Sequence, residues 1–164
     1  MHTLTPVSPS VKYFEDLEVG NSWQSEGRTV TETDVVTFAT WSGDMHPLHT
    51  NAEYAKSTQF GERIFHGPGA LALAFGLEMR IGWKMGSAVA FLGVSDWRMS
   101  SPIFIGDTIT VREEVVDLRA SASNPDRGIV RTRVEIVNQQ GQTCHHGEWA
   151  VLLFKNAAAA LTPQ

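Results

Sequence analysis

The stretch ALALAFGLEMR, residues 70–80, is the part of the sequence that decides the fold. Its residues are small or apolar on nearly every face of a helix, and a helix that is apolar all round is a buried helix. The turn signal Gly67-Pro68-Gly69 precedes it, and the first helical turn points free backbone N–H groups back at that turn. We therefore expect a buried helix from Ala70 to Arg80 at the centre of the domain.

After this helix the sequence changes to the pattern of β-strands. Short turns separate four segments rich in Val, Ile, Thr, Trp and Phe, at residues 88–99, 107–118, 128–137 and 143–153. Consecutive strands joined by short turns form an antiparallel meander. A buried helix followed by such a meander predicts an α+β fold, in which an antiparallel sheet wraps around the helix.

The residues before the central helix carry weaker structural signals. Residues 22–30 alternate imperfectly and fit a short edge strand. Thr31 fits the N-cap of a helix with Asp34 in the capping-box position, and Gly43 fits its C-terminal cap. A second short helix is expected at residues 51–56. The loop that begins at Asp44 therefore starts where a helix stops.

Composition limits the kind of protein. The 164 residues suit one domain, for which we expect an N-terminal arm at 1–12, a single domain at 13–155 and a C-terminal tail at 156–164. The net charge is −5 and Lys and Arg are scattered singly, so no nucleic-acid partner is expected. No apolar run approaches the roughly 20 residues of a membrane span. The single cysteine and an N-terminus without signal-peptide character predict a cytoplasmic protein without membrane association.

The chemistry-bearing residues gather between positions 44 and 69, in the sequence DMHPLHTNAEYAKSTQFGERIFHGPG. It places Asp44 and the histidines His46, His49 and His66 directly before the central helix. A single Asp or His in a loop is more often a turn or cap residue than a catalyst. The combination is more specific, because Pro47 stiffens the chain between side chains that must converge. We interpret this segment as the active site.

Cys144 beside His145 and His146 suggests a nucleophile or a metal site. Adjacent residues on a strand face opposite ways, and no further ligands stand at a suitable spacing. No metal is therefore expected in this protein.

Several motifs together resemble the MaoC-like dehydratase family, the (R)-specific enoyl-CoA hydratases. They are FEDLEVG at 14–20, DMHPLH at 44–49, Tyr54-Ala55 and IFHG at 64–67, followed by Pro102 with Gly106-Asp107. The resemblance covers residues 13–155 and implies the hot-dog fold, a homodimer or a dimer of dimers, and an acyl-CoA thioester substrate. It implies no cofactor, since coenzyme A is part of the substrate.

The resemblance also implies the roles of the site residues. Asp44 and His49 would be the catalytic acid–base pair of hydration or of the reverse dehydration. The backbone N–H of Gly67 would stabilise the enolate-like oxygen, and a glycine that precedes a helix permits close approach to that N–H. His46 and His66 would support them. Which of Asp44 and His49 gives the proton to the α-carbon stays open.

Two departures from the family pattern bear on the substrate. His46 stands where the family motif usually has Asn, and Phe75 stands in the central helix where a small polar residue is expected in some relatives. A bulky ring at position 75 would shorten the acyl pocket or change how the thioester sits. The tryptophans Trp83, Trp97 and Trp149 are expected in the core. The cations Arg63, Lys84 and Arg98 are expected in solvent rather than on coenzyme A phosphates.

Two other functions fit the same fold. A hot-dog thioesterase would activate water against the thioester carbonyl, although the pairing of the acid–base motif with His66-Gly67 is similar to the hydratase signature. A non-catalytic acyl-CoA-binding subunit is the other alternative, and the presence of both Asp44 and His49 speaks against it.

Overall fold

The structure is a computed structural model that describes residues 10–160. Most of the predicted arm, at 1–9, and the end of the predicted tail, at 161–164, lie outside the described residues. The helices are η1 (Phe14–Asp16), α1 (Glu32–Ser42), α2 (Pro47–Thr50), α3 (Ala52–Lys56), α4 (Gly67–Ile81) and α5 (Ala157–Ala160). The strands are β1 (Ser22–Gln24), β2 (Arg28–Thr29), β3 (Ala88–Met99), β4 (Thr108–Ala120), β5 (Arg127–Val137) and β6 (Thr143–Phe154).

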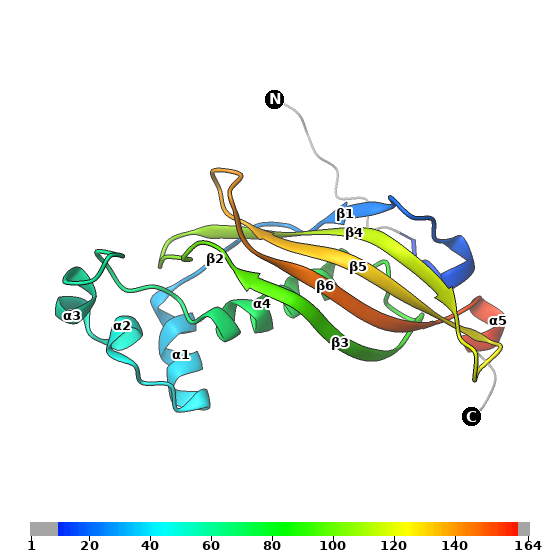
Figure 1. The fold of residues 1–164 in the computed structure, drawn as a ribbon, viewed down its shortest axis with the longest axis horizontal. Coiled ribbons are helices and arrows are strands. Elements are labelled where there is room, and N and C mark those ends of the chain that lie inside the picture. The colour runs from blue at the N-terminus through cyan, green and yellow to red at the C-terminus, as the bar shows by residue number, and fades with distance from the viewer. Residues whose placement is uncertain (1–9, 161–164) are drawn as a thin grey trace.

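All strand pairs are antiparallel, and the long strands run in the order β1-β4-β5-β6-β3, with β2 also paired to β4. The long helix α4 lies behind this sheet, whereas α1, α2 and α3 cluster beyond one end of it (Figure 1). The predicted antiparallel meander around a central helix is confirmed, and all four long strands fall within two residues of their predicted bounds.

The core lies between α4 and the sheet. Its main cluster includes Ala70, Ala74 and Leu77 of the helix, packed with Val111 of β4 and Trp149 of β6. A second cluster beside the end of α4 contains Trp83 at 0% exposure, with Trp23 stacked on it at 4.5 Å between ring centroids. The tryptophans at positions 83, 97 and 149 thus pack in or against the core, as expected.

The helix signals are mostly confirmed. Thr31 and Asp34 form the expected capping box of α1, and Gly43 ends the helix in the left-handed region at φ 78°. The expected helix at 51–56 is α3, with Asn51 as its cap. The helix α2, a single turn that starts at Pro47, was not predicted. Within the predicted C-terminal tail, Ala157–Ala160 forms the short helix α5.

The central helix differs from its prediction in two ways. It begins at Gly67 rather than Ala70, because His66 takes the N-cap position and Pro68 is tolerated in the first turn. One side of it is also exposed in this chain: Ala72, Gly76 and Met79 reach solvent, and Met79 is 44% exposed. The expectation that α4 is buried all round is therefore wrong for the single chain.

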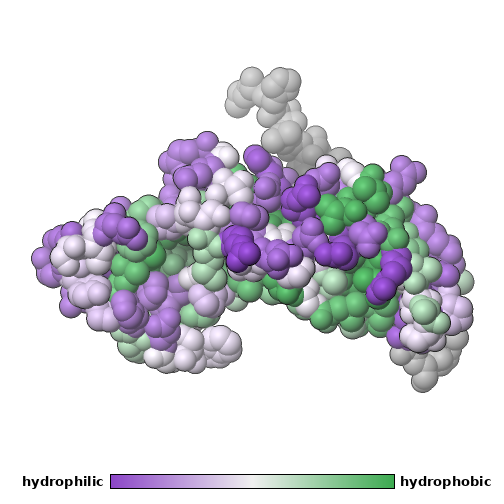
Figure 2. Space-filling view, viewed as in Figure 1, coloured by the Kyte–Doolittle hydropathy of each residue, from purple (hydrophilic) through white to green (hydrophobic). Residues whose placement is uncertain are grey.

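The outer face of the sheet is polar. Charged side chains of opposite sign stand opposite each other on neighbouring strands, such as Glu114 opposite Arg133 and Arg133 opposite Glu148. On the face seen in Figure 2, hydrophilic side chains gather over the middle of the sheet. Among the described residues, no helix is both long and apolar enough to cross a membrane.

Candidate active site

Asp44 follows directly on the end of α1. Its backbone N–H donates to Ser42 Oγ at 3.2 Å, and its Oδ1 accepts the backbone N–H of His46 at 3.2 Å. The side chain is exposed. One carboxylate oxygen thus shapes the turn, as an aspartate in a loop commonly does.

His46 caps the helix α2. Its Nδ1 accepts the backbone N–H of Leu48 at 3.1 Å, and its ring lies edge-on to Tyr54 at 6.1 Å between centroids. An asparagine oxygen performs this capping in many helices. The histidine in place of the family's Asn therefore keeps a cap here.

His49 lies in α2, one turn beyond that cap, with its ring partly buried. Its Nδ1 lies 2.8 Å from the carbonyl oxygen of Ile64. A carbonyl oxygen only accepts, so this bond assigns the proton to Nδ1 and leaves Nε2 with a free lone pair. This tautomer suits a general base at Nε2.

His66 brings the two halves of the site together. Its Nε2 donates to the backbone carbonyl oxygen of Asp44 at 3.0 Å, and its ring stacks on His49 with centroids 3.8 Å apart and planes 27° apart. The side chain is 0% exposed. His66 therefore bonds the backbone of the loop that carries Asp44.

The surroundings of His49 lower its pKa below the ordinary value. Burial is the largest cause, and the hydrogen bond to Ile64 opposes it. His66 and His46 disfavour a positive charge on the ring, whereas Asp44 favours it. The ordinary value is about 6.5, so a lowered pKa keeps His49 neutral at neutral pH.

His49 and Gly67 line one cavity of about 350 Å³. Its other lining residues come from the α3–α4 segment, the end of β3, the following turn and β6: Gln59, Phe60, Ile64, Phe65, Met99, Ser100, Ser101, Pro102, Ile103 and His145. Burial lowers the pKa of His145 to about 4. His145 and Met99 were not predicted to line the cavity, because only the pairing of strands β3 and β6 in the sheet brings them there.

Gly67 is the first residue of α4, so its N–H has no acceptor within the helix. A Cβ added at this position would lie 2.8 Å from the methyl carbon of Met99 and closer still to its sulfur. The absence of a side chain at Gly67 thus leaves room for the flexible end of the Met99 side chain. The same lack of a side chain leaves the N–H accessible from the cavity.

The possible ligand atoms of Asp44, His49 and His66 all lie within 4.8 Å of one another. In each histidine one ring nitrogen is already engaged by a backbone carbonyl, and the two rings are stacked face to face. Such stacking is a poor arrangement for two imidazoles on one ion, since each must point a nitrogen at the metal. A site without metal stays the prediction.

A second cavity, of about 230 Å³, lies further along α4. Phe75 forms part of its wall, stacked on Trp149 at 4.2 Å and edge-on to Phe91 at 4.7 Å. Glu78 and Lys84 also line it and form a buried ion pair. The ring of Phe75 therefore takes up space beside the helix, in a cavity other than the one that His49 and Gly67 line.

The expectation that Lys84 is solvated is wrong. Its side chain is 4% exposed, and it is paired with Glu78 and, at 2.7 Å, with Glu113. Arg63 is not free either, because it makes two hydrogen bonds to Glu32. Only Arg98, of the three cations considered, remains on the exposed surface.

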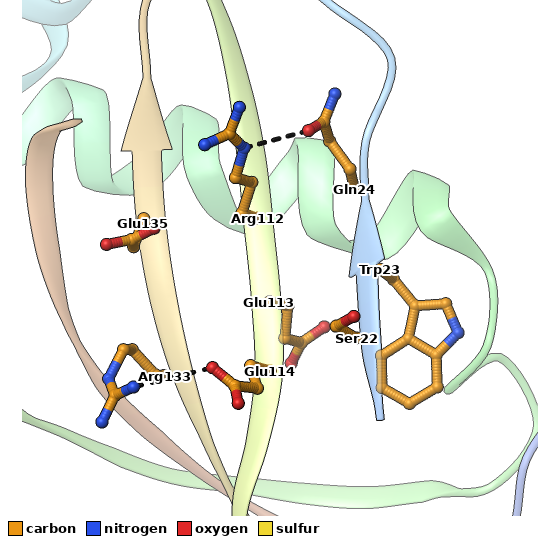
Figure 3. A pocket seen from close by; sticks show the side chains of 8 residues that line it. All are labelled: Ser22, Trp23, Gln24, Arg112, Glu113, Glu114, Arg133 and Glu135. Carbon is orange, nitrogen blue, oxygen red and sulfur yellow. Dashed lines mark hydrogen bonds and ion pairs between the residues drawn. The ribbon is translucent and has the colours of Figure 1, made fainter. Parts of the chain in front are cut away.

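A cavity of about 390 Å³ lies between β1, β4 and β5, and none of the predicted site residues lines it (Figure 3). Its rim is made by hydrogen-bonded and ion-paired side chains, Arg112 with Gln24 and Arg133 with Glu114. At its floor Glu113 is 1% exposed and is bound by Trp83 and Lys84. No acid–base pair comparable to Asp44 and His49 stands free in this cavity.

Two named relatives are similar in sequence. Protein MaoC of Klebsiella aerogenes is 38% identical over 106 residues, which cover 65% of this chain but only 31% of that protein. The (R)-specific enoyl-CoA hydratase of Aeromonas caviae is 32% identical over 140 residues, 85% of this chain and 97% of that protein.

Solved structures are similar to this chain in fold. The MaoC-like dehydratase of Rhodospirillum rubrum has a TM-score of 0.78 at 26% identity, over 88% of this chain and 98% of that one. A Mycobacterium tuberculosis protein with a double hotdog fold has a TM-score of 0.79 at 19% identity, over 94% of this chain and 47% of that one, which bears on the fold alone. The predicted hot-dog fold is confirmed.

The model of the MaoC like domain matches residues 17–138, which include every predicted site residue. Relatives named as hydratases and dehydratases are hydro-lyases, so the predicted enzyme class is confirmed at the level of the family. The chain belongs to the MaoC-like dehydratase family.

Proposed function

We propose that this protein is an (R)-specific enoyl-CoA hydratase, which adds water across the double bond of a 2-enoyl-CoA thioester or catalyses the reverse dehydration. The observation that carries the proposal is the convergence of Asp44 and His49. A carboxylate oxygen of Asp44 and a ring nitrogen of His49 lie within 4.8 Å of each other, and His49 lines a cavity together with Gly67. The Aeromonas caviae relative, with which the chain shares most of its length, bears this activity in its name.

The geometry supports the acid–base chemistry of hydration. The free Nε2 of His49 can take a proton from water, because its Nδ1 is held by Ile64 and its pKa is lowered. Asp44 stands close enough to orient the same water or to exchange a proton with the substrate.

Charge develops on the thioester oxygen while water adds at the β-carbon. Gly67 supplies an N–H at the positive end of the 15-residue helix α4. Donors that are already oriented toward a developing negative charge are among the largest contributions to enzyme rates. We assign this role to the Gly67 N–H, with His46 and His66 supporting the acid–base pair and no cofactor besides the coenzyme A of the substrate.

We also propose that the enzyme acts as a homodimer. The edge strand β3 has no strand partner on its outer side within residues 10–160, and it exposes Phe91, Leu92 and Val94. The exposed side of α4 adds Met79. An edge strand with apolar side chains favours pairing with another strand, which a second copy would supply.

The function is tested by following the ultraviolet absorbance of the conjugated enoyl thioester, using crotonyl-CoA and a longer enoyl-CoA. Wild type should remove the absorbance, and D44N and H49A should each be slower by a factor of about 10²–10⁴. Release of free coenzyme A thiol without loss of the double bond would instead establish a thioesterase. Binding of acyl-CoA with neither reaction would establish a non-catalytic subunit.

A further inference from the structure

His66 contacts both members of the proposed catalytic pair, although no solvent reaches it. Its Nε2 lies 3.0 Å from the carbonyl oxygen of Asp44, and its ring face lies 3.8 Å from that of His49. Its exposure is 0%. A fully buried side chain is poorly placed to touch substrate, so its effect on the reaction must pass through its neighbours.

The hydrogen bond also fixes the tautomer of His66. The carbonyl oxygen of Asp44 only accepts, so the proton is on Nε2. Nδ1 is buried and has no hydrogen-bond partner among the described residues. The ring of His66 thus makes one hydrogen bond, from its Nε2–H to the backbone carbonyl oxygen of Asp44.

Packing holds the His66 ring in this orientation. Phe38 of α1 lies 4.9 Å from it between ring centroids, and Phe65 meets it edge-on at 6.1 Å. Its backbone is the N-cap of α4, at φ −60° and ψ 130°. The His66 ring therefore connects the rigid central helix α4 to the loop that carries Asp44, although the side chain of Asp44 is itself exposed.

We propose that His66 is a positioning residue, which sets the separation of Asp44 from His49 through its Nε2–H donor and its ring face. The inference rests on the proposed function and assigns the two contacts separate tasks. The donor holds the Asp44 loop against the start of α4. The ring face holds His49 so that its Nε2 stays directed at the cavity.

The titratable groups around His49 show how the ring of His66 affects its pKa. Asp44 and His46 face it from its own segment, His66 faces it from the start of α4, and His145 of β6 lines the same cavity. Burial is the main reason that the pKa of His49 is low. Removing the ring that covers His49 admits water and should therefore raise this pKa.

Three variants separate the two tasks. H66F keeps a ring face without the donor, H66Q keeps an amide N–H donor without the ring face, and H66A keeps neither. Each would be assayed for kcat and KM with crotonyl-CoA. The pKa of His49 would be measured in the same proteins by NMR titration of ¹⁵N-labelled imidazoles, a measurement that needs no activity.

H66A should lose about 10- to 100-fold in kcat with little change in KM, because a displacement of about 1 Å can cost that much. H66F should lose kcat while His49 keeps its low pKa. H66Q should regain kcat relative to H66A while the pKa of His49 rises. A general weakening of the fold would change kcat and the pKa of His49 together. It would not lower kcat alone in H66F and change the pKa of His49 in H66Q.

L77A is the matched control, since Leu77 is a buried residue of the same helix that does not line the cavity of His49. It should lower the Tm without changing kcat per folded molecule or the pKa of His49. The proposal is overturned if H66F and H66Q retain both wild-type kcat and wild-type pKa, or if their losses match L77A at equal Tm. If wild type has no hydratase activity, the proposed function fails, and the His49 titration still decides whether His66 holds that ring.

Discussion

The imidazole rings of His49 and His66 lie face to face, with centroids 3.8 Å apart and planes 27° apart. One ring belongs to the short helix α2 and the other caps the central helix α4. The contact places His49 against the residue that precedes Gly67, and His49 and Gly67 line the same cavity. Through His66, the Asp44 loop and His49 are thereby linked to the start of α4, where Gly67 lies.

The pH dependence of the reaction should report the lowered pKa of His49. A general base works only when neutral, so kcat/KM should fall as the pH drops below this pKa and stay level above it. The inflection should lie below the ordinary histidine value of about 6.5. A pH profile of kcat/KM with crotonyl-CoA measures it, and an inflection above that value would contradict the assignment of His49 as the base.

Gly67→Ala should reduce kcat by at least about tenfold, because the new Cβ occupies the approach to the N–H and collides with Met99. The double variant G67A/M99A removes the collision. If activity returns in the double variant, the glycine serves packing and not oxyanion stabilisation.

Gly76→Ala is the control for this change within the same helix. A Cβ at Gly76 meets no atom within 4 Å, and the position is exposed. It should stabilise the protein by about 0.5–1 kcal/mol, as alanine does in place of glycine inside a helix. Thermal unfolding of both variants distinguishes loss of chemistry from loss of stability.

Phe75→Ala should widen the space beside α4, since its ring stacks on Trp149 and borders the second cavity. The ratio of kcat/KM for a longer enoyl-CoA to that for crotonyl-CoA should rise by about tenfold, as expected for a few methylene groups admitted to an apolar pocket. Phe60→Ala, which alters a lining residue of the first cavity, is the comparison. An unchanged ratio in F75A would place the acyl group elsewhere.

Glu78 should make stability depend on pH. Burial raises its pKa from 4.5 to about 7, with Lys84 opposing the shift. Because the folded state holds this proton more tightly, its contribution is present in full below about pH 4.5 and is lost as the pH rises toward 7. The slope reaches at most about 1.4 kcal/mol per pH unit for one proton.

Glu78→Gln should remove this slope, while Lys84 keeps its partner Glu113. Urea unfolding of wild type and E78Q between these pH values measures the difference. Equal slopes in the two proteins would show that Glu78 ionises alike in the folded and unfolded states.

Leu92→Asp should dissociate the proposed dimer, because Leu92 is 50% exposed on the free edge strand β3. Val19→Asp is the control, at a side chain that is 64% exposed away from β3. Sedimentation equilibrium should give a dimer for wild type and V19D and a monomer for L92D. A monomeric wild type would refute the dimer.

Local signals in the sequence predicted most of the fold. The capping box of Thr31 and Asp34, the terminal Gly43 and the strands from Ala88 onward depend on neighbours a few residues away. The start of α4 at Gly67 was missed, because a glycine-proline-glycine run is as typical of a turn as of a first helical turn.

By itself the sequence determined an α+β domain with one central helix, and a motif that nominated Asp44, His49 and Gly67. Periodicity, caps and motif spacing all lie within short segments, so they can be recognised in the sequence without knowledge of the fold. Only the tertiary structure decided that His66 covers His49, that Met99 and His145 enter the cavity, and that Lys84 is buried between Glu78 and Glu113. Those contacts join residues far apart in the chain, and their positions follow from how the sheet packs on α4.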